Sequence, residues 1–200
     1  MLADVIVREL NYDKVLFVPT SNPPHKEIAS KITTEQRVEM VRRFCASVGD
    51  GKFELETCEI DRGGISYTID TLDYIINKYQ GQLERKPALL MGEEIAAEFS
   101  KWKNPELVAL KSDLIIVPRY PDFYGKSVSE VKNRPIGNYL GDFNVHFNHE
   151  KFRYPHKYLE IPILTVSSTE IRARVASSKS YKYLVPKTIY EYIEEEKLYR

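Results

Sequence analysis

Several features that would mark a particular class of protein are scarce in this sequence of 200 residues. Cysteine occurs only at Cys45 and Cys58, too few for a disulfide framework or a thiolate metal site, so free thiols in a reducing cytoplasm are expected. The formal net charge at pH 7 is zero, so no overall field attracts nucleic acid or an anionic membrane. No apolar run approaches the roughly 20 residues of a membrane span. These absences favour a cytoplasmic protein with neither a nucleic-acid nor a membrane partner, in which any phosphate binding is local.

What is present predicts one α/β domain over residues 1–200. Short apolar runs alternate with stretches of helical periodicity, the pattern of βαβ units that build a parallel sheet flanked by helices. Strands are predicted over residues 14–18, 53–60, 88–91 and 114–117 and in the apolar run before Thr165. Helices are predicted over residues 1–10, 33–47, 68–79, 93–99 and 105–111, after Ser167, and from Pro186. Residues 119–160 show no regular pattern and are read as an insert: a lid, a hairpin or a homo-oligomer contact.

Three unusual stretches follow predicted strands: TSNPPHK from Thr20, Gly92-Glu93-Glu94, and VSSTEIR from Val166. In open parallel sheets, ligands bind at the carboxyl ends of the strands. These stretches are therefore the candidate site.

The stretch TVSSTEIR at residues 165–172 places Ser167 and Glu170 at capping-box spacing. The first-turn amides of Ser168 and Thr169 would then point out of a helix N-terminus, which favours an anion. Arg172 adds a permanently charged forked donor one turn further on. Taken locally, the stretch fits an ordinary capped helix with a surface arginine as well as a phosphate site.

Two other positions can each be interpreted either as part of a ligand site or as ordinary structure. Thr68 is a good N-cap for the helix over residues 68–79, which makes either a second anion-accepting helix end or a plain cap. Trp102, the only tryptophan, lies between Lys101 and Lys103. That polar setting favours a partly exposed, ligand-stacking ring over a core tryptophan.

Six separated stretches, taken in order, resemble the nicotinate-nucleotide adenylyltransferases. They are VLFVPTSNPPHK, RGGISYTIDTL, LLMGEEIAAEFSKWK, IIVPR, TVSSTEIR and YLVPKTIYEYIEEEKLY. The resemblance implies a Rossmann-like nucleotidyltransferase fold. It also implies transfer of AMP from ATP, with Mg²⁺, to nicotinate mononucleotide, which gives deamido-NAD and pyrophosphate in NAD biosynthesis. No protein-held metal site is implied.

The resemblance also implies roles for individual residues. The ATP phosphates would lie on Ser167, Ser168, Thr169 and Arg172. Gly92 and Glu94 would face the ATP ribose, although the family usually has Asp where this chain has Glu94.

The acceptor mononucleotide would be bound by a second set of residues. Asn22 and His25 would border it, and Lys26 would contact phosphate and, with Arg172, serve catalysis. The nicotinate carboxylate would bind at Tyr67 and Thr68, and its ring would stack on Trp102. Without the resemblance, Asn22 to Lys26 would read as a surface loop.

One family signature has no counterpart in these residues. The resemblance calls for a Gly-Gly turn after a first, central strand, followed by His-x-Gly-His, and the chain has neither motif nor strand. Either the chain begins upstream of Met1 or it is truncated, and the former is the expectation. The chain as written is expected to have lost most catalysis. Two alternatives stay open: an adenylyltransferase for another acceptor such as phosphopantetheine, and a non-catalytic nucleotide-binding protein.

Overall fold

The computed structural model describes residues 2–20, 32–117, 149–159 and 166–200. These fall into two compact units, Met1–Ser66 with Val166–Arg200, and Tyr67–Thr165. Asn22, His25 and Lys26, and most of the predicted insert, lie outside the described residues. Within the described part, parallel strands form two sheets, β1-β2 and β3-β4-β5. The expected class of parallel sheet flanked by helices is confirmed, with the described strands divided between these two sheets.

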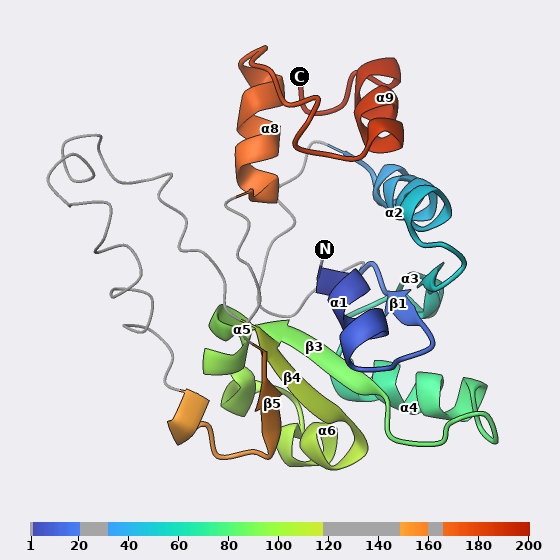
Figure 1. Ribbon diagram of the computed structural model, residues 1–200, viewed down its shortest axis with the longest axis vertical. Coiled ribbons are helices and arrows are strands. Elements are labelled where there is room, and N and C mark those ends of the chain that lie inside the picture. The colour runs from blue at the N-terminus through green and yellow to red at the C-terminus, as the bar shows by residue number, and fades with distance from the viewer. Residues whose placement is uncertain (1, 21–31, 118–148, 160–165) are drawn as a thin grey trace, which may run out of the picture. The chain divides into compact units, whose positions relative to one another are not determined.

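In the first unit, β1 (Val15–Phe17) pairs in parallel with β2 (Phe53–Leu55), Val15 lying opposite Phe53. Helix α1 (Leu2–Glu9) contacts β1, and helix α2 (Thr34–Val48) contacts β2 (Figure 1). Three phenylalanine rings make the small core, the ring of Phe17 lying 5.3 Å from that of Phe44 and 5.5 Å from that of Phe53. Phe53 is buried in this core, whereas the apolar run of β1 is only partly buried.

The N-terminus of α2 follows the sequence closely. The Thr33 hydroxyl accepts the Gln36 amide at 3.2 Å, and the Gln36 side chain accepts the Thr33 amide at 2.9 Å. This reciprocal capping box confirms the predicted start of the helix, because both bonds lie within four consecutive residues.

The strand predicted over residues 53–60 is wrong beyond Leu55. Strand β2 ends there and a short helix, α3 (Cys58–Arg62), follows. The Glu56 carboxylate accepts the Cys58 amide at 3.0 Å and Thr57 donates to Asp61 at 2.7 Å, so local bonds turn the chain out of the sheet. Gly63, with φ +67°, ends the helix, because glycine adopts a positive φ without steric cost.

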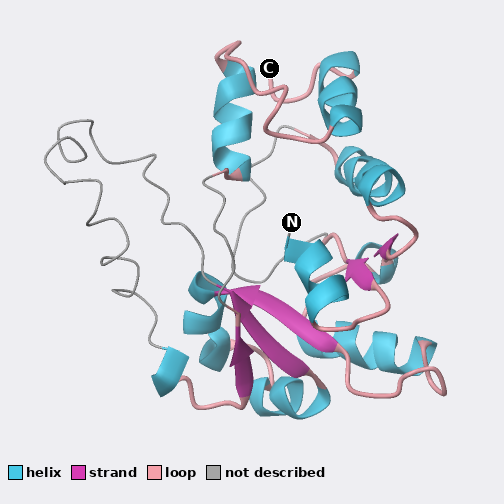
Figure 2. Cartoon of the chain, in the orientation of Figure 1, coloured by secondary structure: helices cyan, strands magenta, loops and turns pink. Residues whose placement is uncertain are grey.

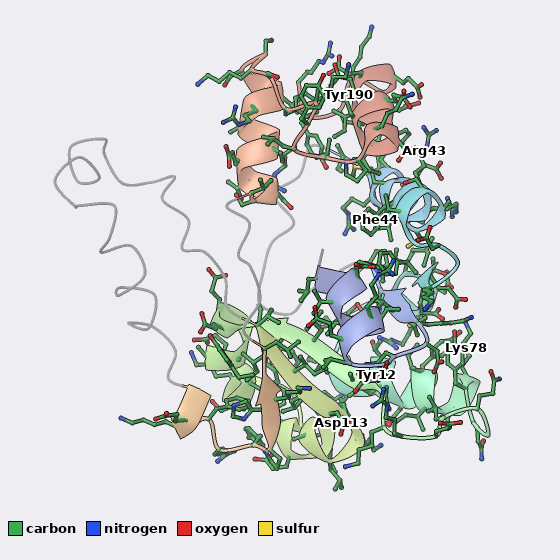
Figure 3. The ribbon with its side chains drawn as sticks, in the orientation of Figure 1. Tyr12, Arg43, Phe44, Lys78, Asp113 and Tyr190 are labelled. Carbon is green, nitrogen blue, oxygen red and sulfur yellow. The ribbon has the colours of Figure 1, made fainter. Side chains whose placement is uncertain are left out.

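Two C-terminal helices complete this unit: α8 (Ser168–Ala176) and α9 (Lys187–Glu195), which begins one residue after the predicted Pro186. Their buried residues form one cluster: Ile32, Ile171, Val175, Tyr181, Tyr192, Ile193 and Leu198. Helix α9 lies against α2, where the Arg43 guanidinium, labelled in Figure 3, is 4.3 Å from the centre of the Tyr192 ring. Tyr192 and Ile193 are the buried residues of α9, so they form its packing face.

The second unit holds a parallel sheet of β3 (Ala88–Gly92), β4 (Asp113–Val117) and β5 (His156–Tyr158), seen as parallel arrows in Figure 2. Helices α4 (Thr68–Lys78), α5 (Glu93–Ala97) and α6 (Pro105–Lys111) and the 3-10 turn Phe99–Lys101 surround it. A further 3-10 turn spans His149–Lys151. Strand β4 is the most buried of the three, as its apolar run predicted: its Ile116 is fully buried, and so are Phe99 and Val108 beside the sheet.

The prediction of an insert without regular structure up to residue 160 is wrong at its end. Residues 156–158 form β5, with Leu114 opposite His156 and Ile116 opposite Tyr158. A three-residue strand carries no readable alternation, and its pairing with β4 joins residues about forty positions apart. Only tertiary pairing could reveal it.

Candidate functional site

The N-terminus of α8 presents hydrogen-bond donors to solvent. The Ser167 hydroxyl accepts the Glu170 amide at 3.1 Å, which confirms Ser167 as N-cap, while the Glu170 carboxylate accepts from Arg174 at 2.8 Å. Ser168 and Thr169 are exposed, and the described residues offer no acceptor for their amides. Two free amides at the positive end of a helix can hold an anion.

Arg172 stands beside these amides. Its guanidinium is half-buried and donates to the Thr169 hydroxyl at 3.3 Å. Burial raises the pKa of the Tyr199 phenol, and the nearby positive charges of Arg172 and Arg37 partly oppose that shift. A second guanidinium, from α2, therefore lies close enough to act on the same phenol as Arg172.

Arg37 was not singled out from the sequence. Its guanidinium donates to the Thr20 carbonyl at 2.7 Å and to the Thr34 hydroxyl at 3.2 Å. Thr20 begins the TSNPPHK stretch, whose Asn22, His25 and Lys26 lie outside the described residues. The Arg37 Nε and the Thr20 hydroxyl are buried with no hydrogen-bond partner in the described part of the chain. The sequence did offer one indication of Arg37: it is a positively charged residue in the first turn of the helix that follows the TSNPPHK stretch.

The N-terminus of α4 differs from its prediction by one residue. Tyr67, with φ −105° and ψ 135°, occupies the N-cap position and makes no side-chain cap bond, and Thr68 is the first helical residue. The Tyr67 carbonyl accepts the amides of Asp70 and Thr71 at 3.1 and 3.2 Å. No acceptor for the amides of Thr68 and Ile69 is found among the described residues, so this helix end is open to an anion.

Trp102 lies near this helix end. Its half-buried ring packs at 5.0 Å on Phe99, and Tyr67 and Trp102 both pack against the same core cluster. The prediction of a partly exposed tryptophan is confirmed.

Lys103 connects Trp102, its neighbour in sequence, to the N-terminus of α4. It was not predicted as a site residue. Its ammonium lies 4.4 Å from the centre of the Tyr67 ring and 3.2 and 3.3 Å from the two carboxylate oxygens of Asp70. A flexible cation next to Trp102 thus reaches the first turn of α4. The second unit brings Tyr67, Thr68 and Trp102 together, although the sequence separates them by more than thirty positions.

The Gly92 turn closes β3 and opens α5. Gly92 is the N-cap, with φ −76° and ψ 160°, and Glu94 is exposed in the first turn. Glu93 is only 9 % exposed and accepts a 2.8 Å hydrogen bond from the Tyr158 hydroxyl at the end of β5. In Figure 1, α5 lies at the arrowheads of the sheet, where ligands of parallel sheets bind.

The described residues contain no group of three or more His, Cys, Asp or Glu side chains that could hold a metal ion. None of the described helices combines the length and apolarity needed to cross a membrane.

Comparison with known proteins places the chain in a family. Residues 1–174 match the cytidylyltransferase-like family. The probable nicotinate-nucleotide adenylyltransferase of Treponema pallidum (strain Nichols) is 34 % identical over 200 residues, which cover all of this chain and 91 % of that protein. The corresponding protein of Borrelia garinii subsp. bavariensis is 30 % identical over 198 residues, covering 99 % and 85 %.

A solved structure agrees in fold. The Plasmodium falciparum nicotinic acid mononucleotide adenylyltransferase complexed with NaAD superposes with a TM-score of 0.66 at 18 % identity, over all of this chain and 88 % of that one. The match to a nucleotidyltransferase family, the level of identity and the shared fold agree with one another. The chain belongs to the cytidylyltransferase-like family and, within it, to the nicotinate-nucleotide adenylyltransferases.

Proposed function

We propose that this chain transfers AMP from ATP to nicotinate mononucleotide, giving deamido-NAD and pyrophosphate, in the cytoplasm. The choice of nicotinate mononucleotide as acceptor rests on one cluster in the second unit. There Lys103, next to Trp102 in sequence, contacts the first turn of α4, whose N-terminus is open. A flat aromatic ring with a carboxylate needs a stacking surface and nearby donors, and Trp102 with the Thr68 amide supplies both. The names of the relatives point to the same acceptor.

The donor half rests on the N-terminus of α8. A phosphate oxygen of the mononucleotide attacks the α-phosphorus of ATP, and the bond from that phosphorus to the bridging oxygen of pyrophosphate breaks. The attacking oxygen is already anionic, so no general base is needed. The amides of Ser168 and Thr169 and the Arg172 guanidinium would compensate the negative charge on the transferring and leaving phosphates.

The remaining predicted residues take supporting roles in this proposal. Gly92 and Glu94 would contact the ATP ribose, and Asn22, His25 and Lys26 would border the mononucleotide and its phosphate. Arg37 would anchor that loop through the Thr20 carbonyl.

Magnesium is proposed as a partner of the ATP phosphates. No acidic cluster of the described residues fits a protein-held ion, and Mg²⁺ commonly binds through substrate phosphates and few protein ligands. No step is assigned to it.

We further propose that these 200 residues on their own turn over slowly. They contain no His-x-Gly-His motif, which the family resemblance assigns to stabilising the transition state. Binding of both substrates should persist, because the residues proposed for binding are present.

The test is pyrophosphate release from ATP with nicotinate mononucleotide, with product identified by chromatography and binding measured by calorimetry. Binding of both substrates with slow formation of deamido-NAD supports the proposal. Binding without any product would favour the non-catalytic alternative, and faster product from phosphopantetheine would replace the acceptor. A longer form carrying the Gly-Gly and His-x-Gly-His segment should be much faster, and full speed without it would contradict the role given to that motif.

A further inference from the structure

A cavity of about 400 Å³ lies between the C-terminal end of α8, the chain that follows it, and α9. Its lining is largely polar, with two tyrosine rings. It is formed by Val175, Ser178, Lys179, Ser180, Tyr181, Lys182, Tyr190, Glu194 and Arg200. The volume falls in the range of small-molecule sites. Helix α8 has nine residues, so this end lies about 12 Å from the amides of Ser168 and Thr169.

Positive charge exceeds negative charge around this cavity. Its one carboxylate, Glu194, accepts from the Tyr181 hydroxyl at 2.6 Å and from the Arg200 guanidinium at 2.7 Å, so both its oxygens are occupied. The hydrogen bond from Tyr181, and secondarily Arg200, lower the pKa of Glu194. Because Glu194 is paired with Arg200, it does not neutralise the two other positively charged residues that line the cavity, Lys179 and Lys182.

Neither of these lysines has a carboxylate partner among the described residues. The Lys182 ammonium lies 6.0 Å from the centre of the Tyr190 ring and 5.7 Å from that of Tyr183. Of the charged residues packed nearby, Arg174 is held by Glu170, and Lys187 pairs with Glu191. Two ammonium groups without a local counter-ion fit a dianion.

Part of the cavity wall is held by contacts within the chain. The Tyr181 ring is 5 % exposed and packs at 5.2 Å on Tyr190, which Figure 3 labels on α9. The Arg174 guanidinium donates to the Ser180 carbonyl at 3.1 Å, and the Lys179 amide donates to the Arg174 carbonyl at 2.8 Å. These contacts hold the tyrosine face and the backbone at Lys179 and Ser180, so the ordering that a ligand requires is that of the exposed Lys179 and Lys182 side chains.

We propose that this cavity binds a small phosphate-bearing molecule with a flat ring, such as a nucleoside monophosphate. Its phosphate lies on the ammonium groups of Lys179 and Lys182 and on the hydroxyls of Ser178 and Ser180. Its ring lies against Tyr190. Two lysines act as point charges on the phosphate, and the tyrosine face accepts an aromatic ring. The site belongs to the first unit alone and does not depend on the proposed reaction.

The test is a titration of the ¹⁵N-labelled full chain, at constant ionic strength, with inorganic phosphate, AMP and adenosine in separate arms. Saturable shifts of the amides of residues 178–182 and of Tyr190 are expected with AMP, with a weaker response to phosphate and none to adenosine. Residue-level shifts separate this site from the N-terminus of α8, where AMP can also bind.

Three variants complete the test. The double substitution Lys179→Ala and Lys182→Ala should weaken AMP binding at residues 178–182 by about tenfold or more. Lys187→Ala, which removes an exposed lysine of α9 outside the cavity, should leave it unchanged, and so should Arg172→Ala. If the double variant and Lys187→Ala lose AMP affinity equally, the effect comes from the overall charge of the protein and the proposal is overturned. Adenosine binding as tightly as AMP, or no saturable shift with any probe, would also overturn it.

Discussion

The Tyr158 hydroxyl donates a 2.8 Å hydrogen bond to the buried carboxylate of Glu93, across 65 positions of sequence. This bond ties the end of β5 to the first turn of α5, next to Gly92 and Glu94. The contact fixes the turn that is proposed to face the ATP ribose.

Replacing Tyr158 with Phe should destabilise the second unit. The substitution removes one donor from a buried carboxylate and should cost about 1–3 kcal/mol of the free energy of unfolding. Urea denaturation followed by circular dichroism measures it. Tyr183→Phe is the matched control, because the Tyr183 side chain is 88 % exposed and should change stability by less than about 0.5 kcal/mol. Equal values for the two variants would show that the bond contributes nothing.

Replacing Lys103 with Ala should weaken binding of nicotinate mononucleotide by about five- to tenfold, because a cation at the first turn of α4 is lost. Trp102 is the only tryptophan, so its fluorescence reports this binding directly. The ion pair with Asp70 is partly exposed, so unfolding free energy should change by no more than about 1 kcal/mol.

Lys101→Ala is the control for Lys103. Lys101 lies two positions away and pairs with Glu98 on the surface. If both lysine variants weaken mononucleotide binding equally, the proximity of Lys103 to Tyr67 has no bearing on the acceptor.

Replacing Arg172 with Ala should weaken ATP binding by about tenfold or more. The ATP affinity of Arg172→Lys should lie between that of the wild type and that of Arg172→Ala. A lysine keeps the charge and loses the forked donor geometry. Calorimetry with a non-hydrolysable ATP analogue gives the affinities independently of turnover. Unchanged affinity in Arg172→Ala would remove this residue from the phosphate site.

Stability should fall in alkali through Cys58. Burial, with help from the charges of Glu56 and Glu59, raises the pKa of this thiol from 9.0 to about 11. The unfolded chain then loses the thiol proton first, so the contribution of Cys58 is complete below pH 9 and is lost as pH rises toward 11. Unfolding free energies of the wild type and Cys58→Ala, measured from pH 8 to pH 11, should converge by about 1–3 kcal/mol. A constant difference across that range would contradict the raised pKa.

Features fixed by neighbouring residues were predictable. The start of the helix at residue 33 and the Ser167 cap each depend on bonds within a few positions. The apolar run of β4 is buried as its composition indicated, and Trp102 is half-exposed as its flanking lysines indicated.

Two kinds of feature were not predictable: pairing with distant residues, and local hydrogen bonds that override the hydrophobic pattern or the expected cap. The short strand β5 exists because β4 offers it an edge, and alternation alone misread residues 56–60 as strand where local bonds turn the chain. The N-cap of α4 is Tyr67 rather than the predicted Thr68, because the Tyr67 carbonyl accepts the first helical bonds without any side-chain cap.

By itself, the sequence determined the α/β class, the starts of α2 and α8 and the family, because periodicity, caps and ordered motifs are local properties of the chain. Tertiary structure alone decided that Lys103 reaches Asp70, that Arg37 holds Thr20, and that Lys179 and Lys182 line one cavity. The first two contacts join residues 33 and 17 positions apart, and the cavity needs α9 to close it. Such relationships depend on packing between elements, which no local pattern encodes.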